Sequence, residues 1–133
     1  MWSRYRFVLP TIHSIEDVVE TDNIKARVSI RVYEIRNMYY IKLIVATIEL
    51  EKLPITSNFI NDPCGMYTFY LVVEPFTYEI ITFLEAKLGI KLIFGSLEEC
   101  KEYAKKYILL KLVARSNIDP IVKQYILNEL SKL

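Results

Sequence analysis

Six side chains in the N-terminal third of the chain combine positive charge with aromatic rings. They are Lys25, Arg27, Arg31, Tyr33, Tyr40 and Lys42. Lysine and arginine neutralise phosphates, and tyrosine rings stack on bases. If Arg36 and Asn37 form a two-residue loop between two strands, Arg31 lies opposite Lys42 and all six side chains share one face. Like charges placed opposite each other repel, so the pattern predicts an anion site that could bind DNA or RNA.

A second interpretation of the same six residues stays open. Ile44, Ala46 and Ile48 alternate in step with Lys42, so helices could cover this face and make the tyrosines part of the core. The register itself depends on the loop, because a shift of one residue exchanges the two faces. The net charge of +1 also argues against a strongly basic nucleic-acid clamp.

The sequence offers little support for a metal site, a phosphate-binding loop or a catalytic site. The only histidine is His13, and Cys64 and Cys100 lie far apart, so no zinc-type spacing exists. Three glycines cannot form either glycine-rich phosphate loop. We therefore expect no metal, no cofactor and no enzymatic activity. The two cysteines are expected as free thiols in an intracellular protein, with one disulfide as the alternative.

The predicted order of elements between Ile15 and Phe94 is helix, three strands, helix, strand. This order resembles the core of the restriction-endonuclease-like fold, which implies Mg²⁺ held by acids on the second and third strands and a nearby lysine. Residues 49–52 (Glu-Leu-Glu-Lys) come closest, but their spacing departs from the Glu-x-Lys pattern, and the predicted strand Met66–Val73 contains no acid. A metal-dependent nuclease is accordingly the third choice of function.

The elements that must position the six residues centre on a long β-hairpin. From Ile24 to Val32 every second residue is apolar, which predicts a strand with one buried face. Both alternating sets are apolar from Tyr39 to Leu50, which is typical of a central strand covered on both sides. Before the hairpin we expect a short strand over Arg4–Leu9 and a helix over Ile15–Thr21, the latter from an N-cap signature at Ser14. Val18 and Val19 fit a strand as well, so a strand is the alternative for this second segment.

After the hairpin, residues 51–65 are predicted to be a long loop, and Met66–Val73 a strand. A helix over Phe76–Leu88, capped by Gly89, then precedes a strand over Ile90–Phe94. Strand, helix and strand within this length predict a βαβ unit with two parallel strands.

Two helices are expected at the C-terminal end. Ser96 and Glu99 form a capping-box signature for a helix that runs to about Arg115, and Asp119-Pro120 starts the last helix, Ile121–Lys132. The inner face of the first should contain Cys100, Tyr103, Ala104, Tyr107, Leu110 and Ala114. Residues 1–133 thus form a single α+β domain, a mixed sheet built on the hairpin and the βαβ unit.

The helix over 97–115 is apolar on nearly all sides around Leu109–Val113, so either the last helix or a second subunit should cover it. From this we expect a non-enzymatic binding or regulatory protein that acts through protein–protein association, as a homodimer or with another protein. Nucleic-acid binding is the alternative. The amino-acid composition, with a single Gln and abundant Lys and Glu, resembles that of small proteins of hyperthermophilic archaea and their viruses. Without a signal peptide or an apolar span, we expect no membrane partner and a cytoplasmic location, in the host if the protein is viral.

Overall fold

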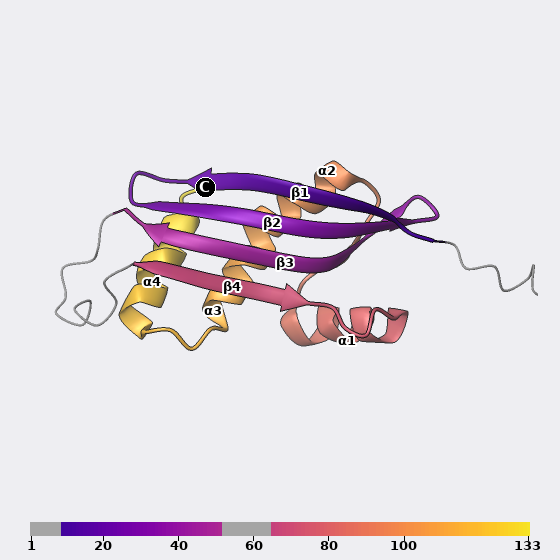
Figure 1. Cartoon of the computed structure of the whole chain (residues 1–133). Helices are drawn as coiled ribbons and strands as arrows, with labels where there is room; N and C mark the ends of the chain where they lie inside the picture. Colours follow the sequence, from indigo (N-terminus) through magenta and orange to yellow (C-terminus); the bar gives the residue numbers. More distant parts are fainter. Residues whose placement is uncertain (1–8, 52–64) are drawn as a thin grey trace, which may run out of the picture.

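The computed structural model describes residues 9–51 and 65–133 and confirms the α+β class (Figure 1). The elements are β1 (Thr11–Glu20), β2 (Ile24–Ile35), β3 (Met38–Leu50), β4 (Met66–Val72), α1 (Tyr78–Leu88), β5 (Ile93–Phe94), α2 (Leu97–Tyr103), the π-helical turn η3 (Ala104–Ile108), α3 (Leu109–Ala114) and α4 (Pro120–Leu130). Strands β1 to β4 follow their sequence order across the sheet, and β5 pairs with β3. Helices α2, α3 and α4 lie on one face of the sheet (Figure 1). Residues 4–8 of the first predicted strand and most of the predicted 51–65 loop lie outside the described residues.

Every pairing in this sheet is antiparallel, so the prediction of a mixed sheet is wrong. The strands β4 and β5 both run antiparallel to β3 and therefore point the same way, as the βαβ prediction requires, but each pairs with β3 and not with the other. The strand β4 pairs with β3 only as far as Leu43. The backbone of β3 at Tyr39 and Tyr40 therefore has no partner in β4 at this edge of the strand. The chain returns to this edge as β5, which is shorter than expected and runs antiparallel to β3. Helix α1 therefore lies beside the end of β4 and does not cross over the sheet (Figure 1).

The segment predicted as a helix over Ile15–Thr21 is part of strand β1. Ser14 caps no helix and lies opposite Arg31 of β2. The β-branched residues Ile15, Val18 and Val19 suit a strand, and pairing along the whole of β2 outweighs the local capping signature. His13, expected near a helix start, consequently lies within a strand.

The hairpin of β2 and β3 is confirmed, with a two-residue turn at Arg36 and Asn37. Both residues have positive φ, 53° and 65°, as a type I′ turn requires. Tyr33 pairs with Tyr40 as predicted, but a β-bulge then shifts the register, so that Arg31 lies opposite Leu43. The predicted pairing of Arg31 with Lys42 is therefore wrong, because Lys42 is the extra residue of the bulge.

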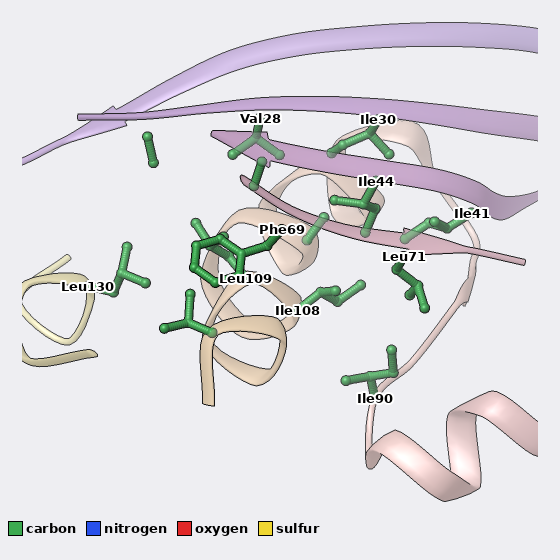
Figure 2. Packing of buried hydrophobic residues seen from close by; sticks show 14 of the residues in the cluster. Val28, Ile30, Ile41, Ile44, Phe69, Leu71, Ile90, Ile108, Leu109 and Leu130 are labelled. Carbon is green, nitrogen blue, oxygen red and sulfur yellow. The ribbon is translucent and has the colours of Figure 1, made fainter. Parts of the chain in front are cut away.

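The bulge also decides which side chains of β3 face the helices. Ile41 and Ile44 are both buried although they are three positions apart, an offset that puts side chains of a regular strand on opposite faces. Ile44, Ala46 and Ile48 accordingly belong to the core, while Leu43 and Val45 face the other way. Figure 2 shows the resulting core, with Val28, Ile30, Ile41, Ile44, Phe69 and Leu71 of the sheet on the side where Ile108, Leu109 and Leu130 of the helices lie.

The predicted helix over 97–115 forms, but its middle turn η3 is a π-turn. Cys100 and Ala104 are buried as predicted, whereas Tyr107 and Ala114 are exposed and Ile108, Leu109 and Val113 are buried in their place. A π-turn accommodates one extra residue, so the buried face after it shifts by one position. Helix α4 packs against α3 and covers the apolar surface that a second subunit could have covered.

The predicted caps are present. The hydroxyl of Ser96 accepts a hydrogen bond from the amide of Glu99 at 3.1 Å, and Asp119 caps α4 with Pro120 in its first turn. The carboxylate of Glu99 does not complete the capping box but pairs with Lys91. Gly89 ends α1 in the left-handed conformation, with φ of 65°.

Candidate interaction surface

The face of the sheet opposite the helices carries no helix in the part of the chain that the structure describes (Figure 1). The strand register arranges its outward side chains in rows, and we call these residues the open face. The rows are Glu20, Lys25, Glu49 and Met66; Val18, Arg27, Thr47 and Thr68; Glu16, Ser29, Val45 and Tyr70; Ser14, Arg31, Leu43 and Val72; and Ile12, Tyr33 and Tyr40.

Three of the six predicted anion-binding residues lie in the main part of this face. Arg27 and Arg31 are exposed, and Lys25 is half-buried. Lys25 has a carboxylate opposite it on each neighbouring strand, Glu20 and Glu49. The two arginines face Val18, Ser14, Thr47 and Leu43 and form no ion pair with a described residue. Arg27 and Arg31 are therefore the basic groups available to a partner.

The other three predicted residues form a separate cluster at the end of the face. The ring of Phe76 lies 4.9 Å from that of Tyr33 and 6.2 Å from that of Tyr40. The ammonium of Lys42 lies 5.8 Å from the centre of the same ring and donates a hydrogen bond to the carbonyl of Val73. Both tyrosines are half-buried. Phe76 thus occupies the tyrosine surface on which a base would have to stack.

Charge on the open face is balanced. Its rows contain three acidic side chains, Glu16, Glu20 and Glu49, and three basic ones, Lys25, Arg27 and Arg31. Glu16 lies opposite Ser29 and forms no ion pair with a described residue. A nucleic acid would bring its phosphates close to these carboxylates, whose repulsion opposes the attraction of the arginines.

An apolar block on the open face was missed by the sequence analysis. Leu43 and Val45 of β3 pair with Val72 and Tyr70 of β4, and the four side chains are neighbours. Tyr70 is 69% exposed and Val72 is 41% exposed. The only sequence signal was the doubly apolar character of β3, which was interpreted as cover on both faces. Large apolar side chains gathered on an exposed sheet face mark an interaction surface.

A hollow of about 400 Å³ lies beside this block. It is lined by Glu16, Asp17, Val18, Arg27, Val28, Ser29, Val45 and Thr47. The short side chain of Ser29 sits in the middle of its row, between Glu16 and Val45. A small residue between longer ones leaves a depression there, and the free groups of Glu16 and Arg27 stand at its rim.

Other groups with possible chemistry are engaged in the fold. On the helix side of the sheet, His13 Nε2 lies 2.8 Å from Glu34 Oε1, and the His13 ring lies 5.9 Å from that of Tyr39. Asp17 accepts a hydrogen bond from Lys105 at 2.7 Å, and this bond lowers the pKa of Asp17. Burial raises the pKa of the Cys100 thiol to about 12, so it is a poor nucleophile at neutral pH.

No group of three or more potential metal ligands occurs within residues 9–51 and 65–133. The resemblance to the restriction-endonuclease-like core is weakened further, because its first helix is the strand β1 and the sheet is antiparallel. Lys52 of the predicted nuclease motif lies outside the described residues, and so does Cys64 of the alternative disulfide.

The fold and the open face define an α+β protein with a five-stranded antiparallel sheet that is covered by helices on one side. Comparisons with protein-family models, with curated proteins and with solved structures find no match to this chain. No helix in the described ranges is both long and apolar enough to cross a bilayer.

Proposed function

We propose that this protein is a non-enzymatic binding protein that associates with another protein chain through the open face. The observation that carries the proposal is an apolar block (Leu43, Val45, Tyr70 and Val72), in which Tyr70 and Val72 are exposed. Beside it stand Arg27 and Glu16, which form no ion pair with a described residue. Protein interfaces favour tyrosine and arginine at their centres, with polar groups around an apolar core. The balanced charge of the face suits a protein partner better than a polyanion.

The experiment that tests this proposal places a photo-crosslinking amino acid on the open face. We would substitute it at Tyr70 and, in a matched control, at Tyr78 of α1, which is 67% exposed and lies outside the face. In cells of the natural source, Tyr70 should give a discrete protein adduct that Tyr78 does not give. Equal adducts at both positions, or none at Tyr70, would contradict the proposal.

Nucleic-acid binding is the second candidate, and the exposed, unpaired Arg27 and Arg31 favour it. Fluorescence anisotropy with labelled DNA and RNA at increasing salt separates the two functions. A phosphate-binding face would lose affinity steeply with salt, and Arg27→Ala would reduce the slope by about one. Lys123→Ala, on α4, is the control that should leave the slope unchanged. We expect no salt-dependent affinity.

A further inference from the structure

We infer that the partner of the open face is a second copy of this chain, packed sheet against sheet so that Tyr70 of each copy enters the hollow of the other. The inference rests on the proposed function and specifies its partner. A two-fold interface brings the same surface together twice, so it must contain both a projecting group and a matching depression. The open face contains both, with Tyr70 on β4 and the hollow around Ser29.

The register of the sheet gives the geometry of this contact. Consider a two-fold axis that lies between the two facing sheets, parallel to the strands and above the gap between β2 and β3. This axis places β4 of one copy over β1 of the other. Each row of the open face then lies over the same row of the second copy. Tyr70 shares its row with Glu16 and Ser29, so each Tyr70 then lies over the rim of the partner's hollow. In the same arrangement Lys25 lies over Glu49, its counterpart in that row. Aligned sheets pack in this way, about 10 Å apart and with a relative rotation of about 30°.

Charge permits this approach and supplies specific contacts. Because the face carries equal numbers of acidic and basic groups, two copies do not repel each other as strongly acidic or basic faces would. The free carboxylate of Glu16 is an acceptor for the hydroxyl of the incoming tyrosine. Tyrosine suits this role, since it buries a large apolar ring and places its polar end at the rim.

The size of the face is sufficient. Four strands about 4.8 Å apart and five rows about 6.8 Å apart give a flat area of roughly 600 Å². Because side chains project from the sheet, the solvent-accessible area of the open face is larger than this flat area. A standard interface buries about 800 Å² per partner, so a face-to-face contact of the whole sheet is comparable with a stable dimer.

Pairing through the edge strand β1 is the competing dimer, and its charges oppose it. An antiparallel pair centred on Val18 would place Glu16 of each β1 opposite Glu20 of the other, and like charges at paired positions destabilise a sheet. Asp17 also points to the helix side, where it binds Lys105. A charged residue on the covered side of an edge strand is a common protection against edge pairing.

Sedimentation velocity over a range up to tens of micromolar tests the inference. The wild type should have twice the 15.7 kDa mass of one chain. Tyr70→Glu removes the aromatic ring and places an acid over Glu16, so it should raise the dimer dissociation constant a hundredfold or more, on the order expected for a central residue used twice. Tyr78→Glu is the control with nearly the same exposure and should leave the constant unchanged.

A rescue variant makes the test specific for this geometry. In the double variant Tyr70→Glu with Glu16→Arg, each acid faces an introduced base of the other copy, so dimerisation should return. Within one chain the two positions are three strands apart, roughly 14 Å, which is too far for a direct ion pair. Circular dichroism that matches the wild type would show that both variants fold.

Three results would overturn the inference: a wild type that stays monomeric, a Tyr70→Glu variant that dimerises like Tyr78→Glu, or a double variant that stays monomeric. The crosslinking experiment separates this failure from failure of the proposed function. A monomeric wild type with a Tyr70-specific adduct to a different protein removes the second copy and leaves the proposed function in place. A monomer without any Tyr70 adduct removes both.

Discussion

At the scale of single residues, Glu129 is the most informative polar group in the described part of the chain. It lies on α4 and is only 4% exposed. Its carboxylate accepts hydrogen bonds from the hydroxyl of Thr21 at 2.7 Å and from the side-chain amide of Asn23 at 3.0 Å. Lys132, two residues beyond the end of α4, pairs with its second oxygen. Since Thr21 and Asn23 belong to the connection between β1 and β2, one carboxylate joins the last helix to the far end of the sheet.

We predict that Glu129→Ala destabilises the protein by about 2–3 kcal/mol, because it leaves the partly buried donors of Thr21 and Asn23 without an acceptor. Urea denaturation at neutral pH measures this as a lower free energy of unfolding. Asn128→Ala, one residue earlier on the exposed side of α4, should change that free energy by less than about 0.5 kcal/mol. Equal effects of the two substitutions would show that Glu129 does not hold the helix to the sheet.

At the scale of elements, the alternation of apolar residues predicted the hairpin correctly. Ile24 to Val32 could be assigned to a strand because its apolar residues recur at every second position, and Tyr33 was placed opposite Tyr40. The bulge at Lys42 could not be foreseen, since an apolar residue stands at every position around it and either register would bury apolar groups. Strand β1 was missed for a related reason. Ser14 and Asp17 match the local signature of a helix N-cap, and only the pairing of this segment with β2 favours a strand over a helix.

The helix from 97 to 114 shows the same limit. The buried positions Cys100, Ala104, Ile108, Leu109 and Val113 fit no single 3.6-residue period. They fit one if a single residue between Ala104 and Ile108 is left out, and the π-turn accommodates that residue. A regular period was assumed in the sequence analysis, which placed Tyr107 and Ala114 on the inner face.

This account predicts that deletion of Lys106, an exposed residue of η3, is tolerated. The deletion turns the π-turn into a regular turn and keeps all five buried residues on one face, so we expect a loss of no more than about 1 kcal/mol in the free energy of unfolding. Deletion of Lys101 in the regular helix α2 is the control. It rotates Ala104 and the residues after it by about 100° and should prevent folding or cost more than about 4 kcal/mol. Thermal denaturation of both variants tests the prediction, and similar losses would contradict it.

At the scale of the whole molecule, the sheet is asymmetric in a way that composition could not reveal. The strands β2, β3 and β4 each have an apolar set on the helix side, to which β1 adds only Ile15 and Val19. Strands β3 and β4 carry a second apolar set on the open face. From sequence, that second set predicted cover on both sides by the chain itself. The six residues predicted to bind an anion are arranged differently from the expectation, because the bulge replaces the pairing of Arg31 with Lys42 and Phe76 packs against Tyr33 and Tyr40.

Two carboxylates join the helical layer to the sheet, and this makes stability depend on acid pH. Asp17 of β1 binds Lys105 of η3, and Glu129 of α4 binds Thr21 and Asn23. The hydrogen bond from Lys105 lowers the pKa of Asp17, and the bonds from Lys132 and Thr21 lower the pKa of Glu129. For a carboxyl whose pKa is lower in the folded state, the unfolded chain binds more protons in the window between the two values, so stability rises with pH there.

The contribution of both groups is therefore fully present above their ordinary pKa values of 3.8 and 4.5 and is lost as the pH falls through the folded values. We predict that the free energy of unfolding of the wild type drops between pH 5 and pH 3, as measured by urea denaturation at fixed salt. Glu129→Gln cannot titrate, so its stability at neutral pH should be lower and its loss on acidification smaller than that of the wild type. Parallel pH profiles for the two proteins would show that the ionisation of Glu129 does not contribute to the pH dependence of stability.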